Sequence, residues 1–150
     1  MLFRSPADSD TLIHLGEALR NYGDALLPLS VQSYIAATFT LQATIKVDPD
    51  YDSDAVLAAV TSALRAAYAF DARDFGQSVT IDEVYAVIQN VAGVIACDVD
   101  QLYRLDPGPT MPQPAPRLLA ALPTVQSDGS VNAAELLTLD AGPLVLGVMP

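Results

Sequence analysis

The stretch "TFTLQATIKV", residues 38–47, decides the fold. Apolar and polar side chains alternate through it without a break, which is the pattern of a β-strand with one buried face. The apolar positions are Phe39, Leu41, Ala43, Ile45 and Val47, and the polar positions are Thr38, Thr40, Gln42, Thr44 and Lys46. Because most of the polar positions are threonine, we expect an antiparallel sheet that is covered on one side only.

Two helices are predicted after this strand. Residues 52–68 carry an apolar stripe at helical spacing, with Asp52 or Ser53 placed to cap the first turn. The next helix starts at "TIDE", where Thr80 and Glu83 form a capping box that contributes about 1 kcal/mol. Gly93 supplies a left-handed residue to end it. The apolar stripes are Val56, Leu57, Val60, Leu64 and Tyr68 in the first helix, and Val84, Val87, Ile88 and Val91 in the second.

Weaker signals precede this central region. The stretch "SDTLIHLGEALRNYG" predicts an amino-terminal helix that is capped by Ser9 or Asp10 and ends at Gly23. The following "LLPLSVQ", residues 26–32, predicts a short strand, which Pro28 moves toward a sheet edge.

The stretch from residue 73 to 94, "RDFGQSVTIDEVYAVIQNVAGV", joins the two predicted helices and leads into a second long strand. Gly76 marks a turn that is followed by a short extended segment. In the strand, Ile95, Cys97 and Val99 alternate with Ala96, Asp98 and Asp100, so the first three residues are expected to face the core.

Residues 106–150 have a different character. Six of the 11 prolines fall in "DPGPTMPQPAPRLLAALP", which predicts an extended linker. The apolar pieces beyond it are too short to fold alone, so this segment is either frayed or docked on its own core or on a partner, and its Leu and Val content favours docking.

The chain is therefore expected to have three parts. Residues 1–28 form an amino-terminal helix and lead-in, residues 29–105 an α+β core module, and residues 106–150 a Pro-rich linker and extended strap. The fold class is α+β, a small mixed or antiparallel sheet with helices packed on one face in a split β-α-β-like arrangement.

Composition narrows the classes of function. The 150 residues are 51% hydrophobic, which suffices for a core, and 18 acidic against 7 basic residues give a net charge of -11. Such a chain repels phosphate backbones and anionic lipids, so binding of nucleic acid or a membrane surface is disfavoured. One cysteine excludes an intrachain disulfide, and the start "MLFRSPADSD" has no apolar core of signal-peptide length. No run is long enough to span a membrane, so we expect a soluble cytoplasmic chain.

The acidic cluster before the first of the two central helices and the single histidine are candidate functional residues. Asp48, Asp50 and Asp52 alternate as in a calcium loop, but Ser53 and Ala59 replace the required glycine and glutamate, so a helix-capping turn is expected. His14, the only histidine, has apolar neighbours and no nucleophile motif, and a surface or partly buried helical residue is expected.

The polar and cysteine residues of the second long strand also give no indication of catalysis. Cys97 lies on the apolar side of the strand and is interpreted as a small core residue. Asp98 and Asp100 share a face without a basic neighbour, which favours solvation or an intersubunit salt bridge over catalysis. Gly76 and Gly93 lack the GK[ST] of a phosphate-binding loop. No catalytic, cofactor-binding or metal-binding residue is therefore predicted, and the chain is not expected to be an enzyme.

A family resemblance follows from the order of these motifs. The residues "ATFTLQATIKVDPDYDSDAVLAAVTSALRAAYAFDARDFGQSVTIDEVYAVIQNVAGVIACDVDQLY" resemble the carboxy-terminal part of baseplate J-like wedge proteins of contractile phage tails and contractile injection systems. The stretch "AELLTLDAGPLVLGVM" also resembles the tail of baseplate assembly proteins. Such proteins are usually much longer, with an amino-terminal region that has no counterpart here.

The resemblance implies a non-enzymatic structural component that joins wedge subunits around the central hub. Its partners would be other wedge subunits and hub, spike or sheath-initiating proteins, with self-association possible in principle and no cofactor, and it would be assembled into a phage tail-like particle. The alternative from charge alone is a small acidic adaptor domain that binds a basic peptide. A hydrolase using Asp98 or Asp100 is a distant third. In the leading interpretation, deletion of residues 118–150 is expected to leave the core folded and to weaken assembly.

Overall fold

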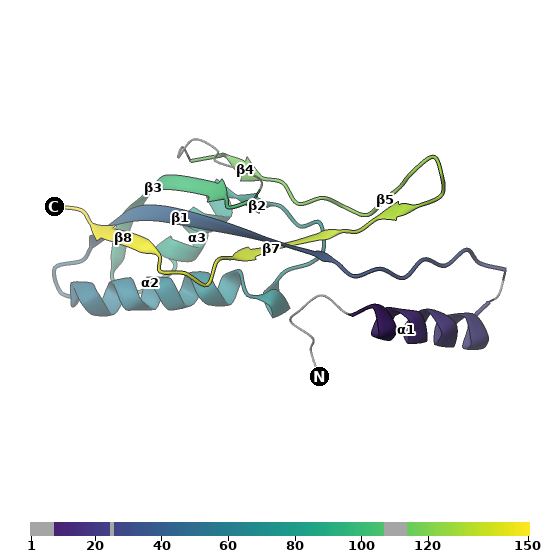
Figure 1. Cartoon of the computed structure of the whole chain (residues 1–150). Coiled ribbons are helices and arrows are strands. Elements are labelled where there is room, and N and C mark those ends of the chain that lie inside the picture. The colour runs from purple at the N-terminus through teal and green to yellow at the C-terminus, as the bar shows by residue number, and fades with distance from the viewer. Residues whose placement is uncertain (1–7, 25, 107–113) are drawn as a thin grey trace.

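The structure is a computed structural model that describes residues 8–24, 26–106 and 114–150. Figure 1 shows a twisted sheet with helices α2 and α3 on one face, and a thinner region that extends beyond the sheet. The elements in chain order are α1 (Ser9–Tyr22), β1 (Ile35–Val47), α2 (Ser53–Ala67), the 3-10 helix η1 (Phe70–Ala72), β2 (Val79–Thr80), α3 (Ile81–Gln89), β3 (Val94–Arg104), β4 (Arg117–Leu118), β5 (Thr124–Val125), β6 (Val131–Asn132), β7 (Glu135–Leu139) and β8 (Val145–Val148).

The main sheet is mixed, which is one of the two predicted arrangements, and the antiparallel orientation expected from the threonines of β1 holds for its pairing with β3 only. β3 pairs with one edge of β1 in antiparallel orientation, while β7 and then β8 run parallel to β1 along its other edge. The predicted α+β class and one-sided helix cover are confirmed. The parallel strands come from the carboxy-terminal segment, which the alternation within β1 could not indicate.

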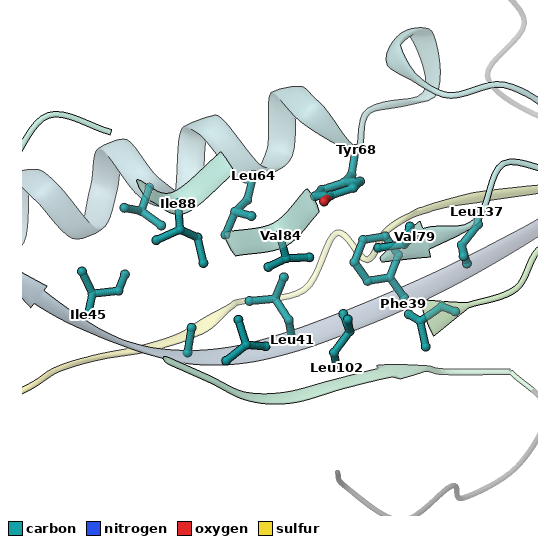
Figure 2. Packing of buried hydrophobic residues seen from close by; sticks show 14 of the residues in the cluster. Phe39, Leu41, Ile45, Leu64, Tyr68, Val79, Val84, Ile88, Leu102 and Leu137 are labelled. Atoms are coloured by element: carbon teal, nitrogen blue, oxygen red, sulfur yellow. The ribbon is translucent and has the colours of Figure 1, made fainter. Parts of the chain in front are cut away.

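The core lies between β1 and the two helices. The predicted inward positions Phe39, Leu41, Ala43 and Ile45 are buried, as is most of the apolar stripe of α2. Figure 2 shows side chains of α2 and α3 meeting those of β1, with strands β3 and β7 contributing one labelled residue each. The labelled residues are Phe39, Leu41, Ile45, Leu64, Tyr68, Val79, Val84, Ile88, Leu102 and Leu137.

Capping side chains start the helices close to the expected positions. The Asp52 carboxylate accepts a hydrogen bond from the Ala55 amide at the start of α2. Thr80 and Glu83 form the predicted capping box, with the Thr80 amide donating to the Glu83 carboxylate at 2.8 Å. For α1 the cap is Asp8, one residue before the predicted Ser9, because the Asp8 carboxylate reaches the Thr11 amide at 2.7 Å.

Gly93 has the predicted left-handed conformation, with φ 88°, but it does not end α3 directly. The helix ends at Gln89, and Gly93 lies in the turn that leads to β3. A Cβ on Gly93 would come within 2.8 Å of Tyr51 and Val56, so both the backbone and the packing require glycine.

Two bulges change which residues of β3 face the core. The register against β1 shifts at Ile95 and again at Asp100, where β3 has an extra residue. Ile95 is therefore 55% exposed, and the prediction that it faces the core is wrong. Cys97 and Val99 keep the predicted inward side, with Cys97 partly buried.

The predicted strand at residues 26–32 is absent from the structure, which has no strand between residues 26 and 34. The Asp24 side chain accepts a hydrogen bond from the Leu26 amide and forms a turn there. Pro28 has no amide hydrogen to contribute to a ladder, and Leu26 and Leu27 are exposed.

The carboxy-terminal segment docks on its own core. β7 pairs with residues 35–39 and β8 with residues 42–45 of β1, so the sheet includes strands beyond residue 105. Leu118, Leu136 and Leu137 are buried. Of the two predicted docking sites, the described residues of this segment therefore use the core of their own chain, while the predicted linker at residues 107–113 lies outside the described residues.

Among residues 8–24, 26–106 and 114–150, no helix has both the length and the apolar character needed to cross a membrane.

Candidate interaction surface

The acidic turn before α2 is a structural turn. Asp48 accepts the Asp50 amide through its side chain and the Tyr51 amide through its carbonyl, while Asp52 caps the helix. Within the described part of the chain, no group of three or more His, Cys, Asp or Glu residues is arranged to hold a metal ion. The expected capping role is confirmed for Asp52.

Asp98 and Asp100 each accept a hydrogen bond from a different side chain, and the bulge in β3 falls at Asp100. The Tyr85 hydroxyl donates to the Asp98 carboxylate at 3.2 Å and accepts from the Val99 amide at 3.2 Å. The Thr44 hydroxyl donates to the Asp100 carboxylate at 3.4 Å. Both aspartates therefore serve as exposed hydrogen-bond acceptors on β3.

The remaining single candidates are also separate from one another. His14 is exposed on α1, as expected, while Cys97 is partly buried on β3. Burial raises the pKa of the Cys97 thiol, which disfavours the reactive thiolate.

The most unusual surface lies on the region that extends beyond the sheet. We define the arm as residues 8–24, 26–34 and 119–134, which include α1 and the β5–β6 hairpin (Figure 1). Among the described residues, 10 of the 17 exposed large apolar side chains lie on the arm, which makes up roughly three-tenths of these residues. They are Ile13, Leu15, Leu19, Tyr22, Leu26, Leu27, Leu29, Leu119, Leu122 and Val125.

The helix of the arm has little of the packing that its sequence predicts. The apolar stripe of α1 suggested a core-facing helix, yet Gly16 is its only buried residue. A Cβ on Gly16 would lie 3.9 Å from Val31, which shows where the helix contacts residues 26–34. Tyr22 is 93% exposed. Within residues 8–24, 26–106 and 114–150, the apolar side of α1 is thus left largely uncovered.

Most charged residues of the arm are acidic. It has five acidic residues and one arginine, so a partner that covers it would gain from a basic border around an apolar centre. These residues are Asp8, Asp10, Glu17, Asp24, Asp128 and Arg20.

An ion pair between β3 and β7 also holds the start of residues 119–134 of the arm through two hydrogen bonds. The Arg104 guanidinium on β3 donates to both oxygens of the Glu135 carboxylate on β7, at 2.8 and 2.9 Å. The same carboxylate accepts the Ala121 amide at 2.7 Å, and Arg104 also donates to the Leu119 carbonyl. The hydrogen bond to Arg104 lowers the pKa of Glu135 and raises that of Arg104. The bonds to Leu119 and Ala121 therefore hold the start of residues 119–134 against β3 and β7, and we call this contact the joint.

Two further arginines hold carboxy-terminal and loop segments to the helices. Arg65 of α2 donates to the carbonyls of Asp140 and Gly142, at 3.1 and 2.6 Å, between β7 and β8. The Arg73 guanidinium lies 5.4 Å from the Tyr68 ring centre and donates to the Ser78 carbonyl at 2.6 Å. Burial raises the pKa of Tyr68 to about 12, so its hydroxyl stays protonated. These groups stabilise loops.

A cavity of about 370 Å³ lies beside this region, lined by residues that include Tyr34, Arg65, Tyr68, Phe70 and Thr138. The guanidinium of Arg65 is already occupied by backbone carbonyls, and most of the other lining side chains are apolar or aromatic. The cavity thus presents a mainly apolar surface.

Sequence reasoning missed the arm and its joint. Arg104 and Glu135 are 31 residues apart, and neither belongs to a motif. One signal in the sequence could have drawn attention to Arg104. Because the chain has only 7 basic residues for its 18 acidic ones, each arginine is expected to have acidic partners.

Comparisons with known proteins add no assignment. No family model matches the chain, and a search of curated proteins finds no match.

Proposed function

We propose that the chain is a non-enzymatic structural component of a contractile tail or injection-system baseplate, which joins wedge subunits around the central hub. The observation that carries the proposal is the arm, where exposed apolar side chains are concentrated on a region that the joint holds at Leu119 and Ala121. Exposed apolar side chains concentrated in one region are typical of sites that bind other proteins. The order of motifs from residue 37 to 103 supports the wedge family in particular.

The arm would bind a neighbouring wedge subunit, and the sheet would hold the arm in a defined direction. The hydrogen bonds from Arg104 to the Leu119 carbonyl and from the Ala121 amide to Glu135 suit this role, because they hold the start of residues 119–134 to β3 and β7. Assembly would occur in the cytoplasm and end in a phage tail-like particle. Hub, spike or sheath-initiating proteins are further candidate partners.

The proposal is tested by binding of the purified chain to the wedge proteins encoded beside it. The variant Leu26→Ser combined with Leu122→Ser removes two exposed apolar side chains of the arm. The matched control is Ile95→Ser, which removes an exposed apolar side chain from β3. We expect the arm variant to weaken binding by about tenfold or more, because buried apolar anchors dominate interfaces, while the control leaves it unchanged.

Two results would contradict the proposal. One is a chain that stays monomeric and binds none of its neighbours, and the other is equal weakening by the arm and control variants. Light scattering after size-exclusion chromatography gives the stoichiometry, and calorimetric titration gives the affinity.

An acidic adaptor domain is the second candidate, favoured by the net charge of -11 and the acidic border of the arm. Salt separates the two functions. Binding of a basic peptide should weaken steeply as ionic strength rises, whereas apolar binding by the arm should not. For the distant hydrolase interpretation, replacing Asp98 and Asp100 by Asn should leave function unchanged if the chain is not an enzyme.

A further inference from the structure

The outer edge of β8 has backbone groups that no described residue pairs with. The Met149 amide donates to the Ile45 carbonyl at 2.8 Å, and Val148 is the register partner of Ile45. In a parallel ladder this geometry turns the backbone groups of Gly147 and Met149 toward β1 and those of Leu146 and Val148 away from it. The N–H and C=O of Leu146 and Val148 are therefore free to pair with another strand.

The opposite edge of the same sheet is protected in several ways. β3 carries two bulges, and the exposed Asp98 and Asp100 lie along it. The Tyr85 hydroxyl accepts the Val99 amide, and the Ala115 amide donates to the Leu102 carbonyl. Bulges, charges and covering segments are the devices that prevent a sheet edge from pairing with other chains.

β8 is a short strand of four residues, but it has neither a bulge nor a charged side chain. Residues 141–150, "AGPLVLGVMP", contain no charged side chain, although the whole chain has a net charge of -11. Val145 and Val148 are 57% and 46% exposed, and the strand shows no bulge in its register with β1. The contrast with β3 marks this edge as available for pairing.

We propose that the β8 edge binds a second copy of this chain, in antiparallel orientation about a two-fold axis at Gly147. In this register Leu146 faces the second copy's Val148, and Val145 faces the second copy's Met149. Every facing pair is apolar, and the two glycines meet at the axis, where antiparallel Cα atoms approach most closely. The inference is independent of the proposed baseplate role.

Charge limits where a second copy can bind. Two chains of net charge -11 repel each other over most of their surfaces, and an uncharged strand is where they can approach at the lowest electrostatic cost. Pairing would leave Leu146 and Val148 fully hydrogen-bonded and would join two four-stranded sheets into one continuous sheet.

The register is tested by disulfide cross-linking in a Cys97→Ser background, which removes the native thiol. Gly147→Cys is combined with Thr44→Ser, because a Cβ at position 147 would lie 3.2 Å from the Thr44 methyl group. At the axis the two Cα atoms should be about 4.5 Å apart, within the range that a disulfide spans. We expect a cross-linked dimer under mild oxidation.

The matched control for the register is Val145→Cys in the same background. Its copy lies four positions further along the paired strand, roughly 13 Å away, which is too far for a disulfide. Preferential cross-linking at position 147 supports the two-fold register. Equal cross-linking at both positions, or none at either, would overturn it.

A second pair of variants tests the hydrogen bonds. Val148→Pro removes an amide that faces away from β1, while Val148→Ala keeps that amide and shortens the side chain. In sedimentation equilibrium, we expect Val148→Pro to weaken dimerisation about tenfold or more and Val148→Ala to weaken it less. Higher salt should strengthen the dimer, because it screens the like charges of the two copies.

Thermal unfolding of each variant shows whether the fold survives; if Val148→Pro does not fold, the cross-linking pair decides. A wild-type chain that remains monomeric from micromolar to millimolar concentration contradicts the proposal. So does a dimer that Val148→Pro, when folded, leaves unchanged.

Discussion

The helix-covered sheet and the arm contain similar apolar side chains but bury them to opposite extents. Leu41 on β1 is fully buried between sheet and helices, whereas Leu26 on the arm is 92% exposed. Apolar patterning alone does not separate them, since α1 has a helical stripe much as α2 does. The two helices differ in their partners, because α2 packs against a sheet of its own chain, while among the described residues α1 lies close to Val31 and has no buried residue other than Gly16.

The largest expected effect comes from deleting residues 118–150. The deletion removes β7 and β8 and the buried Leu118 and Leu137, so we expect the loss of cooperative thermal unfolding. This reverses the expectation from sequence that the core would stay folded. Replacing residues 124–132, the hairpin tip of the arm, by two glycines is the control and should keep the transition cooperative. A sharp transition in the first variant would show that the sheet is stable without β7 and β8.

Single truncations at equivalent side chains sharpen the same contrast. Leu41→Ala should lower the free energy of unfolding by about 2–5 kcal/mol, because it leaves a cavity in the core. Leu26→Ala should change it by less than about 0.5 kcal/mol. Urea denaturation followed by circular dichroism measures both values. Similar losses in the two variants would mean that the arm is packed in solution.

Glycines with positive φ provide a third comparison. Gly93 and Gly129 have φ of 88° and 84°, but a Cβ meets Tyr51 and Val56 at the first and nothing within 4 Å at the second. Gly93→Val should therefore cost about 3 kcal/mol or more, and Gly129→Val about 1 kcal/mol from backbone strain alone. Thermal denaturation of the two variants is the measurement. Equal losses of stability in the two variants would contradict the close packing of Tyr51 and Val56 around Gly93.

The joint between sheet and arm should give a smaller effect than the changes at Leu41 and Gly93. Glu135→Gln weakens the bonds from Arg104 and should cost about 2 kcal/mol at neutral pH. Since pairing lowers the pKa of Glu135 from its ordinary value of 4.5, its contribution is present above that pH and is lost as the pH falls through the folded pKa. Denaturation at pH 7 and in the acid range should show wild type losing more stability than the variant. A constant difference between the two would contradict this linkage.

Local patterns predicted most of the fold. The alternation at Phe39–Ile45, the Asp52 cap and the capping box at Thr80 depend on neighbours within a few residues, and each appears in the structure. Ile95 was misplaced because a bulge adds a residue and inverts the alternation, which no count of apolar positions reveals.

Long-range partners were beyond the reach of the sequence. The pairing of β7 and β8 with β1, and of Arg104 with Glu135, joins segments that no periodicity connects. The arm was missed for the same reason: a helical stripe such as that of α1 predicts an apolar face but does not specify what covers it.

The pairing of β1 with strands so distant in the chain has a consequence for synthesis. Ile35 pairs with Glu135, which a ribosome adds about 100 residues later, an interval of roughly 5–20 seconds. During that time β1 has been made but the strands for one of its edges have not. The nascent chain therefore exposes an apolar edge strand, and a holding chaperone or a nearby partner would have to shield it until β8 arrives.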